Sequence, residues 1–154
     1  MRLPCGKIFT LSLVILLAAV AFAHNHHALN GTWSLIPARS NFGGGPEIQN
    51  GSLTIKDREG NLYVSRNFDV ENSGHGLNSY GFQADGPEHS TIRDGKEFRT
   101  KAHWEGDVLE VTTVQDGRTT VERFSLTPDG SLILVVDRQD MAPLTLMFRR
   151  VGLP

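Results

Sequence analysis

The sequence is poor in the residues that cross-link a fold or carry thiol chemistry. Its 154 residues contain one cysteine, Cys5, so no intrachain disulfide can form. The 15 basic side chains are outnumbered by 17 acidic ones, and no long basic run interrupts this near balance. A nucleic-acid-binding surface needs clustered lysine and arginine. We therefore predict no nucleic-acid partner.

Catalytic and cofactor-binding motifs are also missing. The chain has no Gly-x-Ser-x-Gly elbow, no phosphate-binding glycine loop before a helix and no His-Glu-x-x-His pair. His75, His89 and His103 stand on separate segments, without the spacing of a zinc or haem site. We predict that the protein is not an enzyme.

Residues 1–23 have the pattern of a secretory signal peptide. Arg2 and Lys7 precede an apolar run over 8–21, and Ala21-Phe22-Ala23 supplies the small residues of a cleavage site. The apolar run is short for a membrane span, although an uncleaved anchor is the alternative. Cys5 lies ahead of the run, where a bacterial lipoprotein would not carry its lipid. We expect a bacterial protein that is secreted or periplasmic and has no membrane span once cleaved.

Cleavage after Ala23 would create a histidine-rich N-terminus on a polar tail, residues 24–29. His24, His26 and His27 would then fall within four residues. The terminal amine, two backbone amides and the third-position imidazole match the square-planar nitrogen site that Cu(II) and Ni(II) prefer. The alternative is a tail that meets metal only adventitiously. Apart from this candidate copper or nickel site we predict no cofactor.

Residues 96–137 show the clearest local pattern, four strands joined by tight turns. The predicted turns are Glu105-Gly106, Asp116-Gly117 and Pro128-Asp129-Gly130, since glycine accepts positive φ and aspartate tolerates it. Such turns fix the strand register. The expected cross-strand pairs are Ala102–Leu109, Thr100–Val111, Phe98–Thr113, Leu109–Phe124, Val111–Glu122, Leu126–Leu132, Phe124–Leu134 and Glu122–Val136.

This register divides the strands into an apolar face and a charged face. Lys101, Glu110 and Arg123 share the outer face, with Lys101 and Glu110 as a surface pair. Glu122 falls on the apolar face, where an unpaired carboxylate is costly. It would either anchor a bound ligand, pair with Arg66 or Arg138, or lie in a hydrated interior.

Six further segments alternate as strands do: 31–36, 52–57, 62–68, 77–82, 90–93 and 144–151. Residues 37–47, rich in glycine and proline, are predicted to form a loop or a broken turn of helix, and residues 24–154 show no helical periodicity. About ten strands joined by hairpins predict one all-β domain over 30–154. An up-and-down antiparallel barrel of 8–10 strands closes the sheet edges, and a twisted sandwich is the alternative. An outer-membrane barrel needs an apolar exterior, which this charged outer face excludes.

Gly31-Thr32-Trp33 resembles the Gly-x-Trp signature of the calycins, the group of lipocalins and fatty-acid-binding proteins. The resemblance implies a barrel plugged at one end by Trp33, with Arg149 or Arg150 packed across its ring. With ten strands rather than eight, the predicted barrel resembles the fatty-acid-binding branch more than the lipocalins. The chain lacks that branch's helix pair between the first two strands, and also the Arg-x-Tyr of the last strand that would hold a fatty-acid carboxylate. The mid-chain Thr-Asp-Tyr of lipocalins is missing too.

Small and hydroxylated residues among the large inward ones favour a hollow interior. The candidate lumen residues are Phe98, Thr100, Trp104, Leu109, Val111, Glu122, Phe124 and Leu134. We predict an exported, monomeric, lipocalin-like barrel that binds a small apolar or amphipathic molecule. The alternatives are a periplasmic copper or nickel protein that acts through its histidines, and a structural or protein-interaction barrel.

Overall fold

The computed structural model describes residues 26–152, so the predicted signal peptide and His24 lie outside the described residues. Within this range the chain forms ten strands and two short 3-10 turns, and no helix with the length and hydrophobicity to cross a bilayer. The strands are β1 (Gly31–Leu35), β2 (Ile48–Arg58), β3 (Asn61–Val70), β4 (Gly74–Gln83), β5 (Glu88–Arg93), β6 (Lys96–Glu105), β7 (Val108–Gln115), β8 (Arg118–Leu126), β9 (Leu132–Arg138) and β10 (Leu144–Arg150). The 3-10 turns are η1 (His26–Leu29) and η2 (Pro37–Arg39).

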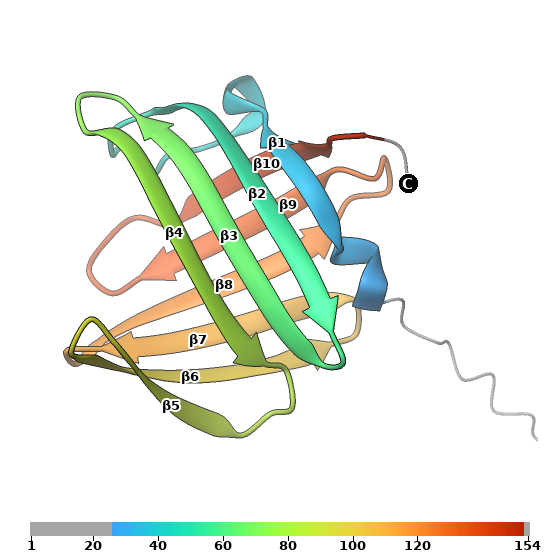
Figure 1. Cartoon of the computed structure of the whole chain (residues 1–154). Helices are drawn as coiled ribbons and strands as arrows, with labels where there is room; N and C mark the ends of the chain where they lie inside the picture. The colour runs from blue at the N-terminus through green and yellow to red at the C-terminus, as the bar shows by residue number, and fades with distance from the viewer. Residues whose placement is uncertain (1–25, 153–154) are drawn as a thin grey trace, which may run out of the picture.

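The ten strands form one antiparallel sheet in the order β4-β3-β2-β1-β10-β9-β8-β7-β6-β5. β1 pairs with both β2 and β10, which curls the sheet round on itself. β2, β3 and β4 cross β6 to β9 at a steep angle (Figure 1), and the buried residues of both halves form one core. β4 and β5 follow each other in the sequence but are the two edge strands of the sheet and do not pair with each other. The predicted up-and-down barrel is confirmed as a nearly closed one.

Two of the three predicted hairpin registers are confirmed. Leu109 pairs with Phe124 across the β7–β8 hairpin, and Glu122 pairs with Val136 across the β8–β9 hairpin. In the β7–β8 turn, Asp116 and Gly117 both have positive φ, 51° and 76°. This is the type I′ geometry that an Asp-Gly pair favours.

The predicted register of the β6–β7 hairpin is wrong by two residues. Glu105 pairs with Val108, so the turn consists of Gly106 and Asp107 rather than of Glu105 and Gly106. Gly106 has a φ of 60° and takes the first turn position, which favours glycine in a type II′ turn. The observed pairs are Ala102–Val111, Thr100–Thr113 and Phe98–Gln115. Because the shift is two residues, every side chain keeps its predicted face.

The expected pairing of Lys101 with Glu110 fails with that register. His103 is the residue opposite Glu110, and Lys101 lies opposite Thr112. Arg123 takes Glu110 instead, with its Nε 2.8 Å from the carboxylate, and its Nη1 lies 2.7 Å from Asp137. The outer face is therefore charged, as predicted, but with a different partner for Glu110.

The apolar inner face forms the hydrophobic core. Leu109, Val111, Phe124 and Leu134 are fully buried on one half of the barrel, and Leu53, Ile55 and Phe148 on the other. Burying a side chain of this size contributes about 1.5–3 kcal/mol each. The core thus accounts for the inward orientation of the alternating strands.

Trp33 and Arg150 close one end of the barrel. The Trp33 side chain is fully buried and its Nε1 donates to the carbonyl oxygen of Leu29 at 3.0 Å. The Arg150 guanidinium carbon lies 4.1 Å from the centre of the Trp33 ring. Arg149 is exposed and faces outward, so Arg150 is the arginine across the tryptophan.

The segment expected to be a polar tail takes part in this closure from residue 26 onward. η1 places Leu29 in the core with only 2% of its surface exposed. Arg150 donates to the carbonyl oxygens of Ala28 and Asn30, at 2.6 and 2.5 Å. The burial of Leu29 and the hydrogen bonds from Arg150 hold η1 in place across the barrel end.

Candidate functional site

A cavity of about 550 Å³ lies toward the other end of the barrel. It is lined from the start of β2, the end of β3 and the start of β4 on one half, and from β8, the end of β9 and the start of β10 on the other. In an antiparallel barrel those strand ends meet at one mouth. The apolar lining residues are Ile48, Phe68, Val70, Leu77, Leu134, Val136, Leu144 and Leu146, and the polar ones are Arg66, Asn78, Thr120, Glu122 and Arg138.

The connection between β1 and β2 runs beside β10. Ile36 donates its N–H to the carbonyl oxygen of Met147 at 2.7 Å, and Asn41 exchanges two backbone hydrogen bonds with Thr145 at 2.7 and 2.8 Å. Over residues 36–47 the only helical element is the three-residue η2, so the prediction of a loop or a broken turn of helix is confirmed. The helix pair of the fatty-acid-binding branch is absent from this connection.

Three side chains form a buried polar cluster, and two of them, Arg66 and Glu122, line the cavity. The Arg66 Nη2 lies 2.6 Å from the Glu122 Oε1 and donates to the Tyr80 hydroxyl at 2.5 Å. The Tyr80 hydroxyl in turn donates to the Glu122 Oε2 at 2.5 Å. The Arg66 and Glu122 side chains are 17% and 8% exposed, so this is a nearly dry ion pair. Of the alternatives for Glu122, the partner is Arg66.

The surroundings hold two members of the cluster in defined protonation states. Burial raises the pKa of the Tyr80 phenol well above its usual value, Arg66 opposes that rise, and Glu122 adds to it. Burial would lower the pKa of the Arg66 guanidinium, but Tyr80 and Glu122 outweigh burial and raise it. At neutral pH the phenol therefore keeps its proton and the guanidinium its charge.

Arg93 bridges the seam between β4 and β5, where strand pairing is missing. Its guanidinium carbon lies 5.7 Å from the centre of the Tyr80 ring on β4 and 4.3 Å from that of Phe98 on β6. Such contacts contribute about 0.5–2 kcal/mol each. Side-chain stacking thus holds the seam in place of a backbone ladder.

Comparisons with known proteins point to a single fold. No protein-family model and no curated protein sequence matches this chain. Solved structures do match. A mutant of the fluorescent protein UnaG superposes with a TM-score of 0.62 at 19% identity, covering 82% of this chain and 99% of that one.

Two further structures come from named organisms. Fatty-acid-binding protein 1 of Echinococcus granulosus has a TM-score of 0.58 at 15% identity, covering 82% of this chain and 99% of its own. Secretory abundant heat soluble protein 4 of Ramazzottius varieornatus has a TM-score of 0.60 at 14% identity, with 81% and 96% covered. The chain shares the fold of these solved structures.

The predicted lumen residues lie in different parts of the barrel. Glu122 and Leu134 line the cavity, whereas Leu109, Val111 and Phe124 are fully buried in the core. Thr100 is buried as well, and Phe98 lies under Arg93. Trp104 lies toward the closed end, where its ring stacks on that of His26 with centroids 4.0 Å apart. The structure therefore brings two of the eight residues to the cavity.

Tyr80 belongs to the polar cluster but was not selected from the sequence, and Arg66 was named only as a partner of Glu122. The alternation of the sequence could have identified Arg66, because it occupies an inward position between Val64 and Phe68 on β3. Tyr80 is placed by its pairing with Val64 across the β3–β4 hairpin. That hairpin turns through residues 71–73 without an Asx-Gly pair, so its register could not be predicted.

The N-terminal histidines enter the described structure only in part. His26 stacks on Trp104, and His27 Nδ1 lies 3.5 Å from Asp57 Oδ2. Within residues 26–152, no three histidine, cysteine or carboxylate side chains gather as metal ligands. The predicted copper or nickel site also needs His24 and the new amine, so it stays a prediction.

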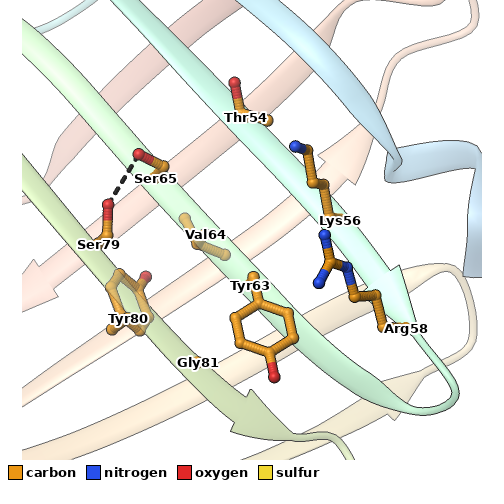
Figure 2. A pocket seen from close by; sticks show the side chains of 9 residues that line it. All are labelled: Thr54, Lys56, Arg58, Tyr63, Val64, Ser65, Ser79, Tyr80 and Gly81. Atoms are coloured by element: carbon orange, nitrogen blue, oxygen red, sulfur yellow. Dashed lines mark hydrogen bonds between the residues drawn. The ribbon is translucent and has the colours of Figure 1, made fainter.

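A second hollow, of about 410 Å³, lies on the outer surface of β2, β3 and β4 (Figure 2). The Tyr63 ring lies over Gly81, and Lys56 and Arg58 stand beside it. The Ser65 and Ser79 hydroxyls are hydrogen-bonded to each other at 2.8 Å (Figure 2). Most of its lining residues are polar or charged, whereas most of those that line the interior cavity are apolar, so an apolar molecule is better accommodated by the interior cavity.

Proposed function

We propose that the protein is an exported, non-enzymatic carrier that holds one small apolar or amphipathic molecule inside its barrel. The observation that carries this proposal is the interior cavity of about 550 Å³, whose wall is mostly apolar side chains around one buried polar cluster. Ligand sites in proteins have this size and this mixture of apolar wall and few polar groups.

The fold is compatible with this role. Structures with the same fold include proteins named as a fatty acid transporter and as a fatty-acid-binding protein. The signal-peptide pattern of residues 1–23 supports export. Intact-mass spectrometry of the secreted protein tests whether and where the chain is cleaved. We expect a mature chain that begins at His24.

Native mass spectrometry of the purified mature protein tests the carrier function. We expect co-purifying small molecules, and after delipidation we expect an uncharged solvatochromic dye to bind with one-to-one stoichiometry. Gly76→Phe supplies the decisive variant. Gly76 pairs with Phe68 on the inner face, and the nearest atom to an added Cβ is 3.9 Å away, so the backbone tolerates a side chain that enters the cavity.

Ser79→Phe is the matched control because Ser79 lies on the same strand but faces outward. Gly76→Phe should weaken dye binding by at least about tenfold, and Ser79→Phe should leave it unchanged. Equal binding by both variants, with unchanged melting temperatures, would place the dye elsewhere and overturn the proposal. A mature protein that binds neither dye nor lipid would do the same.

A further inference from the structure

The charges that face the cavity cancel each other in its interior. Arg66 and Glu122 form a direct pair at 2.6 Å, and both side chains are mostly buried. Arg138, the third charged lining residue, is exposed at the end of β9, where water screens its charge. Arg93 is not among the lining residues, and its guanidinium lies against the Phe98 ring. The deep part of the cavity is therefore polar without net charge.

The hydrogen bonds of the cluster are nearly complete as well. Each carboxylate oxygen of Glu122 accepts one hydrogen bond, from Arg66 or from Tyr80. The Arg66 Nε–H is buried and has no acceptor among the residues that the structure describes. That nitrogen has almost no accessible surface, so it is not a contact point for a ligand. The polar groups that Arg66 and Glu122 bring to the cavity wall belong to a pair whose charges cancel.

This arrangement does not suit a carboxylate. An anion that enters the cluster loses its hydration, which costs far more than the transfer of an uncharged oxygen. The positive charge that would compensate it is already neutralised by Glu122. An anion near Arg66 would also lie near the Glu122 carboxylate and be repelled by it.

We propose that the cavity selects an uncharged amphipathic molecule, an alcohol, ketone or ester on an apolar chain, whose oxygen lies against the charge-compensated Arg66–Glu122 pair. This inference rests on the proposed function and names its ligand class. Glu122 is the residue that determines specificity, because it removes the net positive charge that a carboxylate ligand would need.

A comparison of chain-matched ligands on the wild-type mature protein tests the proposal. Dodecanol, methyl dodecanoate and dodecanoate share one chain length and differ in the head group. Each displaces the solvatochromic dye at neutral pH, below its micellar concentration. We expect the alcohol and the ester to bind at least about tenfold more tightly than the carboxylate.

Glu122→Gln then reverses the preference. It leaves the Arg66 charge uncompensated, so dodecanoate should gain at least about tenfold while dodecanol changes by less than about threefold. The double variant Arg66→Met with Glu122→Leu replaces the ion pair by apolar groups, which a fold often tolerates without loss. It should bind the dye normally, lose affinity for the alcohol by about tenfold, and remain testable if Glu122→Gln fails to fold.

The outcomes separate the two proposals. Dodecanoate binding as tightly as dodecanol to the wild type would overturn the selectivity and leave the carrier function standing. Unchanged alcohol affinity in the double variant would show that the oxygen does not lie against the Arg66–Glu122 pair and would overturn the proposed selectivity. Failure of the dye and of all three ligands to bind would overturn both proposals together.

Discussion

Arg150 lies across the indole of Trp33, with its guanidinium carbon 4.1 Å from the ring centre. The same guanidinium donates to the carbonyl oxygens of Ala28 and Asn30 ahead of β1. One side chain of the last strand therefore holds the first strand and η1 together. This contact closes the barrel end where the chain's first and last strands pair.

Replacing Arg150 by methionine should lower the free energy of unfolding by about 1–2 kcal/mol, because a partly exposed cation–π contact and two hydrogen bonds are lost. Urea denaturation measures this change. Arg149→Met is the matched control, since Arg149 is exposed on the outer face and should change stability by less than about 0.5 kcal/mol. Equal effects of both variants would contradict the assigned role of Arg150.

Gly31→Ala should also destabilise the closed end. Gly31 has a φ of 135°, and a Cβ there would lie 2.7 Å from the Arg150 Nη1. The strained backbone costs about 1–3 kcal/mol, and the crowded arginine adds to it. Gly76→Ala is the control, since an added Cβ meets only ordinary contact there. A thermal melt in which the two variants lose equal stability would refute this account of the Gly-x-Trp signature.

Breaking the buried pair should cost more than breaking an exposed one. Glu122→Ala leaves Arg66 charged in a nearly dry place, and the expected loss is about 3–5 kcal/mol. Glu110→Ala breaks the outer-face pair with Arg123, which is screened by water, and should cost less than about 1 kcal/mol. Chemical denaturation of both variants checks the ranking, and a Glu122→Ala protein as stable as Glu110→Ala would contradict it.

The Tyr80 phenol should make stability depend on alkaline pH. Burial raises its pKa well above the usual value in the folded protein, Arg66 opposing and Glu122 assisting the rise. Because the folded pKa exceeds the unfolded one, the neutral phenol's contribution is complete below about pH 10. It is lost as the pH rises from there toward the folded pKa.

Urea denaturation between neutral pH and the alkaline range tests this dependence. Tyr80→Phe should lose less stability with rising pH than the wild type. Tyr63→Phe, which removes the half-exposed tyrosine, should follow the wild type. Parallel curves for wild type and Tyr80→Phe would show that Tyr80 ionises equally well in both states.

The N-terminal metal hypothesis predicts an optical signal. Because the His26 ring stacks on Trp104, copper bound through His26 should quench the Trp104 fluorescence of the mature protein. His26→Ala should abolish the tight quenching phase in a Cu(II) titration. His75→Ala serves as the control, since His75 lies on β4 beside Asp69. Identical titrations of all three proteins would end the hypothesis.

The rules for turn residues and strand alternation gave the most accurate predictions, those of the strands and of their faces. Asp116-Gly117 placed the β7–β8 turn correctly because few residue pairs accept two positive φ values in succession. At Glu105-Gly106-Asp107, by contrast, the glycine suits either turn position, and the sequence alone did not decide between them. The wrong β6–β7 register does not change the predicted inward orientation of Glu122 on β8. Side-chain direction depends only on whether a residue's position along the strand is odd or even.

The amino-acid sequence by itself determined the strands, their inner and outer faces and the antiparallel barrel, because alternation and tight turns act over a few neighbouring residues. Tertiary structure alone decided that Arg66, Tyr80 and Glu122 meet, since they come from β3, β4 and β8 and their contact depends on how the curved sheet closes. It also decided which end is filled by Trp33 and which end holds the cavity. The positions of these side chains depend on the accumulated twist of all ten strands, and no local sequence pattern encodes that accumulated twist.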